Sequence, residues 1–189
     1  MTTAANHDCA MTSVSHAHGV TVRRLASVSA PQMRALAEVL VDCVEGGASV
    51  SFMHPLSMAK AVAFWAHVAD EVDTGRRALV VAEDGSGIVG TVQLVLDLPE
   101  NQPHRAEVSK MLVHRKMRRH GVGAALMQTA EVIAKDSGKT LLVLDTASAD
   151  AERLYARLGW KLCGVIPGFA LLPEGGLCAT SYFYKALPP

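Results

Sequence analysis

The sequence predicts a mixed α/β fold in which helices cover both faces of one sheet. Strand-like segments and segments of helical periodicity follow one another in the order β-α-α-β-β-β-α-β-α-β-β. The chain of 189 residues, half of them apolar, is long enough for one buried core and too short for two. The tetrapeptide DGSG between two β-rich runs is a strong hairpin signal. We therefore expect one α/β domain.

The amino-terminal part predicts a tail followed by a strand and two helices. Residues 1–19 are polar, small and without periodicity, which predicts a flexible tail, and we expect a single domain over residues 20–189. The run VTVRRL is the first strand. Pro31 opens a helix that ends at Gly46 and Gly47. After the loop GGASVSFMHP, a second helix carries its apolar residues on one face.

The centre of the chain predicts three strands and a helix. The runs ALVVAED and GIVGTVQLVLDL flank DGSG, and RAEVSKMLVH gives the next strand. A helix follows from Gly121 to Ser137, with apolar residues along one stripe and Gly138 as its C′ residue.

The carboxyl-terminal part predicts a buried strand, a short helix and two closing strands. TLLVLDT is an unbroken apolar run, as in a strand covered on both faces. The next helix begins at a Ser148 cap and stops at Gly159. WKLCGVI and TSYFYKAL close the sheet, and we expect the turn-rich stretch PGFALLPEGGLCA between them to be a loop.

Composition narrows the classes of partner. Acidic and basic residues balance at 18 each, which gives no reason to expect nucleic acid or an anionic membrane as a partner. No apolar run approaches the roughly 20 residues of a spanning helix, and no secretory signal is evident. Four cysteines without CxxC spacing argue against a zinc or other metal site and favour free thiols in a reducing compartment. We expect a cytoplasmic protein.

A basic, glycine-containing turn stands within the stretch HRKMRRHGVGAALM. A strand, a glycine turn and a helix start together present free backbone N–H groups and a positive dipole end, which bind phosphate oxygens. We call residues 118–124 the glycine turn. The pattern GxxxxGK[ST] is absent, and no third glycine completes a GxGxxG pattern at this turn. On this turn alone, a phosphate site and an ordinary helix start remain equally open.

The helix downstream distinguishes the two. The pattern R-x-x-G-x-G at residues 118–123, followed after one helix and one strand by AERLYARLGW, resembles the GCN5-related N-acetyltransferase (GNAT) superfamily. The resemblance implies a mostly antiparallel twisted sheet with a V-shaped splay between the fourth and fifth strands, and one acetyltransferase domain that uses acetyl-CoA. The implied acetyl-CoA contacts are Met111, Leu112, Val113, Arg118, Arg119, His120, Gly121, Val122, Gly123, Ala124 and Ser148.

The chain departs from the superfamily pattern at three positions. Arg115 stands where proline is common, Arg119 where glycine is common, and Ser148 where asparagine often opens the later helix. Within the superfamily, the stretches GGASVSFM, RAEVSKMLV, LDT and PGFALLPEGG are most similar to tabtoxin-resistance acetyltransferases, which acetylate an amino-acid-like β-lactam toxin.

The resemblance implies a catalytic acid, and the sequence offers two candidate bases. Tyr155 matches the tyrosine that commonly protonates or hydrogen-bonds the coenzyme A sulfur, although a core aromatic is the alternative reading. Amine attack also needs a proton acceptor. Glu107 and Asp145 are the candidates; Glu107 could instead be a surface residue beside Arg105, and Asp145 could cap the following helix.

The function expected from these features is acetyl transfer from acetyl-CoA to a primary amine of a small molecule, by direct attack in a ternary complex. An amino-acid-like toxin or antibiotic is the expected acceptor, with a detoxifying or self-resistance role. The alternatives are a protein or peptide N-acetyltransferase and a non-catalytic acyl-CoA-binding regulatory module. We expect a monomer or homodimer. Asp42 and Glu45 could attract a cationic amine or could simply be a solvated helix end.

Overall fold

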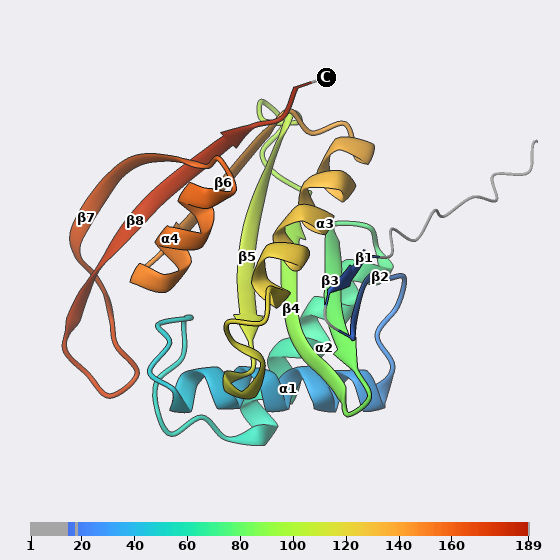
Figure 1. Cartoon of the computed structure of the whole chain (residues 1–189), viewed down its shortest axis with the longest axis vertical. Helices are drawn as coiled ribbons and strands as arrows, with labels where there is room; N and C mark the ends of the chain where they lie inside the picture. The colour runs from blue at the N-terminus through green and yellow to red at the C-terminus, as the bar shows by residue number, and fades with distance from the viewer. Residues whose placement is uncertain (1–14, 18, 189) are drawn as a thin grey trace, which may run out of the picture.

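A computed structural model describes residues 15–17 and 19–188, which form one twisted sheet flanked by helices (Figure 1). The strand order is β1-β2-β3-β4-β5-β6-β8-β7. The strands are β1 (Ser15–Ala17), β2 (Val20–Leu25), β3 (Arg77–Asp84), β4 (Gly87–Val95), β5 (Arg105–Val113), β6 (Leu141–Thr146), β7 (Lys161–Leu171) and β8 (Leu177–Ala186). The helices are α1 (Ala30–Glu45), α2 (Met58–Asp73), η1 (Arg115–Met117, a 3-10 helix), α3 (Val122–Asp136) and α4 (Ala149–Arg157).

Two apolar cores lie on opposite faces of the sheet. Helices α1 and α2 pack on one face, where Trp65 and Leu40 are fully buried with Leu79 of β3. Helices α3 and α4 cover the other face, where Leu126 and Met127 are fully buried (Figure 1). The predicted fold class, a mixed sheet with helices on both faces, is confirmed.

Serine side chains set where three of the helices begin. Ser29 caps α1 in a capping box with Gln32, and Ser57 accepts a hydrogen bond from the Lys60 backbone N–H at the start of α2. Ser148 caps α4 as predicted, because its hydroxyl accepts from Ala151 N at 3.4 Å.

The sheet opens between β5 and β6. All neighbouring strands pair antiparallel except this pair, which is parallel. Its register covers only Arg105–Glu107 against Leu141–Val143, although β5 runs on to Val113 and β6 to Thr146. The predicted V-shaped splay between the fourth and fifth of the expected strands is therefore present, and it leaves the carboxyl ends of β5 and β6 apart.

The amino-terminal end of the described chain adds a strand that the sequence did not predict. Ser15–Ala17 pair with Val20–Val22, inside the stretch expected to be a tail. Gly19, with φ of +79°, allows the chain to reverse there, and the pairing satisfies backbone groups at the edge of β2. Residues 1–14 lie outside the described residues, so the division into a tail and one domain stays a prediction.

The β7–β8 hairpin is longer than predicted. The stretch PGFALLPEGGLCA was expected to be a loop, but β7 continues to Leu171 and β8 begins at Leu177. Pro167 and Gly168 produce a register shift between Ile166 and Ala170 rather than a turn. The chain instead reverses at Gly175 and Gly176, both with positive φ. The hairpin therefore projects well beyond β6 and forms a wall beside the splay.

Two further features of the described residues concern membrane spans and cysteine pairing. None of the helices within residues 15–17 and 19–188 combines the length and apolar character that a membrane span requires. Cys43, Cys163 and Cys178 are free thiols.

Candidate active site

The turn between β5 and α3 exposes backbone N–H groups at one point. Gly121 precedes α3 with φ of +78°, a conformation that residues with a side chain rarely adopt. A Cβ at Gly121 would meet nothing within 4 Å, so the space in front of the helix is open. The positive end of the α3 dipole therefore faces an accessible position at which an anion can bind.

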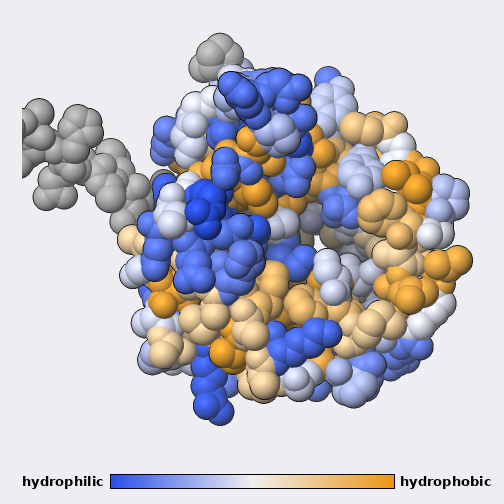
Figure 2. Space-filling view, turned by 180° about the vertical axis from the view of Figure 1, so that it is seen from behind, coloured by the Kyte–Doolittle hydropathy of each residue, from blue (hydrophilic) through white to orange (hydrophobic). Residues whose placement is uncertain are grey.

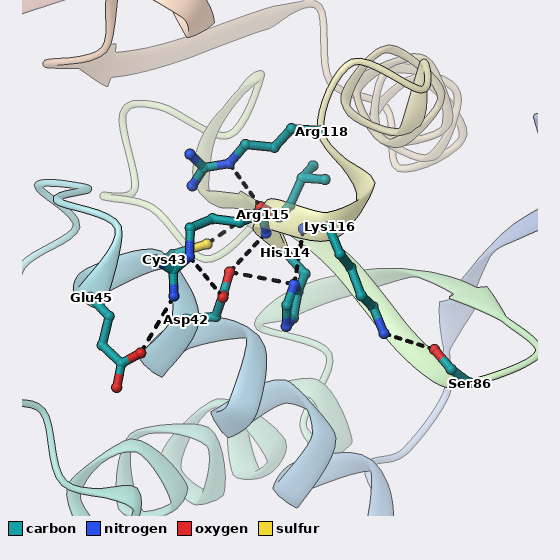
Figure 3. A network of polar contacts seen from close by, with 9 residues as sticks. Asp42, Cys43, Glu45, Ser86, His114, Arg115, Lys116 and Arg118 are labelled. Carbon is teal, nitrogen blue, oxygen red and sulfur yellow. Dashed lines mark hydrogen bonds and ion pairs between the residues drawn. The ribbon is translucent and has the colours of Figure 1, made fainter.

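Arg118 and Arg119 bring positive charge to this point. Arg118 Nε donates to Val113 O at 3.3 Å, which holds its guanidinium beside the end of β5 (Figure 3). Arg119 has φ of +69° and, like Arg118, lines the cavity described below. His120 bonds through its ring nitrogen to Arg118 O at 2.8 Å and is exposed outside that cavity.

Gly123 serves a packing role that the sequence analysis did not anticipate. A Cβ at this position would lie 3.1 Å from Leu154 Cδ2, which is closer than ordinary van der Waals contact. Gly123 thus lets α3 and α4 approach closely on one side of the splay. The two positions of the turn require glycine for different reasons. Gly121 has a backbone conformation that favours glycine, whereas a side chain at Gly123 would crowd Leu154 of α4.

A cavity of about 780 Å³ occupies the splay. This volume is within the range of small-molecule and cofactor sites, roughly 300–1,000 Å³. Figure 2 shows the molecule hollowed between the apolar hairpin on one side and the body of the domain. The walls come from residues 46–53 between α1 and α2, residues 109–113 of β5, the glycine turn, residues 145–148 and α4, and residues 169–172 of the hairpin.

The cavity brings together most of the predicted site residues. Twelve of the fourteen line it: Met111, Leu112, Val113, Arg118, Arg119, Gly121, Val122, Gly123, Ala124, Asp145, Ser148 and Tyr155. The two that do not are Glu107 and His120. One cavity is therefore lined both by the glycine turn and by the side chains of Tyr155 and Asp145.

Tyr155 is held rigidly in the wall of the cavity. Its side chain is 4% exposed and packs between the rings of Trp160 and Phe183, with centroids 5.9 and 5.8 Å away. Burial, with a smaller contribution from the Asp145 carboxylate, raises the pKa of Tyr155 well above its ordinary value. The phenol therefore stays protonated and can donate a hydrogen bond into the cavity.

Asp145 stands at the end of β6, where that strand leaves β5. Thr180 Oγ1 on β8 donates to its Oδ2 at 2.9 Å, which fixes the carboxylate toward the cavity. Asp145 does not cap α4, because Ser148 has that role and Ser148 N donates to Thr146 Oγ1 instead. The carboxylate is thus free to accept a proton or a hydrogen bond from a bound molecule.

Glu107 lies at the closed end of the splay. It is paired with Val143 of β6 in the last register position before the strands separate. Its carboxylate accepts from Arg105 Nη1 at 2.7 Å, and the side chain is 47% exposed. The structure thus matches the surface reading and leaves Asp145 as the candidate base that shares the cavity with Tyr155.

Comparisons with known proteins bear on this arrangement. The acetyltransferase (GNAT) family matches residues 44–160, which is more than half of the chain. The chain belongs to this family. A human protein, N-acetyltransferase 8B, is 36% identical over 87 residues, and the match covers 44% of this GNAT chain. This chain thus spans 38% of the length of that relative.

Solved structures share the fold of this GNAT chain. An N-acetyltransferase from Staphylococcus aureus Mu50 matches with a TM-score of 0.74 and 16% identity, over 89% of this chain and 99% of the other. A GNAT superfamily phosphinothricin acetyltransferase from Sinorhizobium meliloti, in complex with acetyl-CoA, matches with a TM-score of 0.72 and 20% identity, over 89% of each chain. At these identities the likeness concerns the fold. Family and fold together support an acyl-CoA N-acetyltransferase enzyme.

The structure of this GNAT chain also answers what Asp42 and Glu45 do. Asp42 accepts from Arg115 through both the backbone N–H and Nε, and Glu45 accepts from Arg115 Nη2 at 3.4 Å (Figure 3). Partial burial would raise the pKa of Asp42, but the hydrogen bonds from Arg115 and the nearby His114 outweigh it and lower that pKa. Both acids are engaged by Arg115 rather than held free for a cationic amine.

Among the side chains that line the cavity and were not predicted from the sequence is Lys110 of β5. The signal was present, since a lysine within the strand-like run EVSKMLV is costly to bury. The face of the sheet on which the Lys110 side chain lies could not be predicted from the sequence, because a bulge in β5 shifts the register between Ser109 and Leu112. Among the described residues, no group of three potential metal ligands comes together.

Proposed function

We propose that this GNAT chain transfers the acetyl group of acetyl-CoA to a primary amine of a small molecule, by direct attack within a ternary complex. The observation that carries the proposal is that one cavity contains both the anion-binding turn before α3 and the pair Tyr155 and Asp145. Donor binding and acid–base chemistry therefore have a common site, which a binding module does not require.

The glycine turn and the end of β5 would hold the donor. The backbone N–H groups that follow Gly121, with the charges of Arg118 and Arg119, suit the pyrophosphate of coenzyme A. Residues 111–113 lie along the open edge of β5, where backbone groups not paired with β6 can bond an extended pantetheine arm. Acetyl-CoA supplies the thioester carbonyl to be attacked and the thiolate that departs.

Tyr155 would assist departure of the thiolate. Its raised pKa keeps the phenol neutral, so it offers a hydrogen bond to the sulfur as negative charge develops there. Complete proton transfer to a thiolate of ordinary pKa, about 8.5, would be uphill from such a phenol. Stabilisation by hydrogen bonding is therefore the role that the pKa shift favours.

Asp145 would take a proton from the attacking amine, directly or through a water molecule. It faces the cavity, and its Oδ2 is oriented by Thr180. Glu107 remains the second candidate base, but its bond to Arg105 and its position outside the cavity count against it. A base within reach of the bound amine is needed because the nucleophile must be the neutral form.

The proposed acceptor is an amino-acid-like toxin or antibiotic, and the proposed role is detoxification or self-resistance. The support is the similarity of four short stretches to tabtoxin-resistance acetyltransferases, together with a cavity that the β7–β8 hairpin partly encloses. We propose a cytoplasmic monomer or homodimer, in line with three free thiols in the described chain.

The test is a thiol-release assay with acetyl-CoA and separate sets of amines: amino-acid-like antibiotics, aminoglycosides, polyamines and peptides with free amino termini. We expect coenzyme A release with a small amine and a product heavier by one acetyl group in mass spectrometry. Turnover on peptides alone would contradict the small-molecule proposal. Acetyl-CoA binding without release for any amine would support a regulatory module instead.

A further inference from the structure

The backbone of the cavity wall is strained at two residues that contact each other, Ser51 and Lys110. Within the described chain, the non-glycine residues with positive φ are Ser51 (+74°), Lys110 (+48°) and Arg119 (+69°), and all three line the cavity. Residues other than glycine are strained in this conformation, and residues of this kind cluster at functional sites. Lys110 Nζ donates to Ser51 Oγ at 3.1 Å.

This contact holds the Lys110 ammonium beside the loop between α1 and α2, where both Lys110 and Ser51 line the cavity. Ser51 belongs to the loop between α1 and α2, and Nζ also lies 5.8 Å from the centre of the Phe64 ring of α2. A hydroxyl and an aromatic face do not neutralise an ammonium group. None of the ion pairs within residues 15–17 and 19–188 includes Lys110.

Among the described residues, the charged groups around Lys110 form no direct ion pair with it. Burial lowers the pKa of Lys110, and Asp145 opposes this shift while Arg77 adds to it. Arg77 is itself engaged by Glu71 at 2.6 Å. Asp145 faces the same cavity but is bound by Thr180. The cavity therefore presents one cation and one anion, Lys110 and Asp145, that are near each other and not joined by a direct ion pair.

We infer that Lys110 is a specificity-determining residue that binds the carboxylate of an amino-acid-type acceptor, whose amine is thereby directed toward Asp145. An acceptor with both charges complements both unpaired groups at once, whereas a simple amine leaves Lys110 without a counter-ion. This inference rests on the proposed acetyl transfer and adds to it the residue that selects the acceptor.

The experiment compares α-amino acids with two matched sets, their carboxamides and their decarboxylated amines, in steady-state assays with acetyl-CoA. For the wild-type protein we expect kcat/KM to be highest for the acids. Lys110→Met keeps the length of the side chain and removes its charge. We expect it to lower kcat/KM for the acids by roughly 30-fold or more, as for other buried charge pairs that lose one partner, and to change the carboxamides little.

Two further variants separate this role from a structural one. Lys110→Arg keeps the charge, and we expect it to retain most of the preference for acids. Lys60→Met is the matched control. Lys60 also lies over an aromatic ring, that of Phe52 at 5.9 Å, but Lys60 itself does not line the cavity. We expect this variant to keep the wild-type kcat/KM for the acids, the carboxamides and the decarboxylated amines. KM for acetyl-CoA and the melting temperature verify that each variant is folded and binds the donor.

The outcomes distinguish this inference from the proposed function. Equal losses for acids and carboxamides in Lys110→Met would overturn the inference, and so would a wild-type preference for amines that lack a carboxylate; acetyl transfer itself would stand in both cases. Absence of transfer to every amine tested, peptides and polyamines included, would contradict the proposed function and this inference together.

Discussion

Arg115 holds the Asp42 carboxylate at two points: its backbone N–H donates to Oδ2 at 2.8 Å, and its Nε donates to Oδ1 at 2.9 Å. Asp42 belongs to the end of α1, just before the loop of residues 46–53 that lines the cavity. Arg115 begins η1, which leads into the glycine turn. The pair therefore connects the loop of residues 46–53 to η1 and the glycine turn, which we propose to bind the donor.

Loss of this connection should weaken donor binding. We expect Asp42→Asn to raise KM for acetyl-CoA severalfold, because the Arg115 side chain loses a charged acceptor and the start of η1 becomes less fixed. Glu45→Gln is the control, since its contact with Arg115 is longer, 3.4 Å, and half-exposed. Equal effects of the two substitutions would assign the result to surface charge rather than to the double contact.

The same carboxylate predicts a pH dependence of stability. The pKa of Asp42 is lower in the folded protein than its ordinary value of 3.8, so the unfolded state binds the proton more readily. The stability from Asp42 is fully present above this ordinary value and is lost as the pH falls through the folded pKa. In urea unfolding, the gap between wild type and Asp42→Asn should be constant from about pH 5 upward and close at lower pH. A gap that widens on acidification would contradict this assignment.

Removal of the Tyr155 hydroxyl should affect turnover and leave the packing intact. We expect Tyr155→Phe to lower kcat by about 10²-fold, as for the loss of one hydrogen-bond donor to a developing negative charge. KM for acetyl-CoA should stay close to the wild-type value, because the ring keeps its contacts with Trp160 and Phe183. Stopped assays of thiol release, with thermal melting as the folding check, measure both effects. An unchanged kcat at saturating substrate would exclude Tyr155 as the donor to the sulfur.

Asp145 and Glu107 are distinguished by one pair of isosteric substitutions. We expect Asp145→Asn to reduce kcat by roughly 10²-fold or more, because the attacking amine loses its proton acceptor. Glu107→Gln should change kcat little, because that carboxylate is bound to Arg105 outside the cavity. The reverse result would assign the proton acceptor to Glu107.

The two glycines of the turn should respond differently to alanine. Gly121→Ala forces a side chain into a left-handed conformation, at a cost of about 1–2 kcal/mol, and should weaken coenzyme A binding in calorimetry. Gly123→Ala meets the end of a flexible leucine side chain at 3.1 Å, so a small shift of Leu154 can relieve the contact. If Gly123→Ala weakened coenzyme A binding more than Gly121→Ala, the turn conformation would not be what holds the donor.

Local signals predicted much of this molecule from its sequence. The start of α3 at Gly121, the Ser148 cap and the order of the expected elements depend on neighbouring residues, and the structure confirms them. The motif at residues 118–123 also implied the splay, which periodicity cannot predict. Strand β1 escaped prediction because its pairing, rather than its polar sequence, makes it extended.

What the sequence could not provide depends on distant contacts. Glu107 and Asp145 both lie on strands beside the splay. What distinguishes the two carboxylates is the position at which β5 and β6 stop pairing, and this position cannot be read from the sequence. Lys110 enters the cavity because a bulge in β5 alters the alternation of side chains. In the β7–β8 hairpin, Pro167 and Gly168 are residue types that favour turns. Here they lie within β7, where the pairing with β8 shifts register between Ile166 and Ala170 and then continues.

The short pairing between β5 and β6 also bears on how the protein would respond to its ligand. Three register positions join two portions of the sheet that are otherwise each well paired. A donor lying along the open edges would bridge these portions and restrict their relative movement. We therefore expect slower amide hydrogen exchange in β5 and β6 on binding, at backbone groups on both sides of the splay.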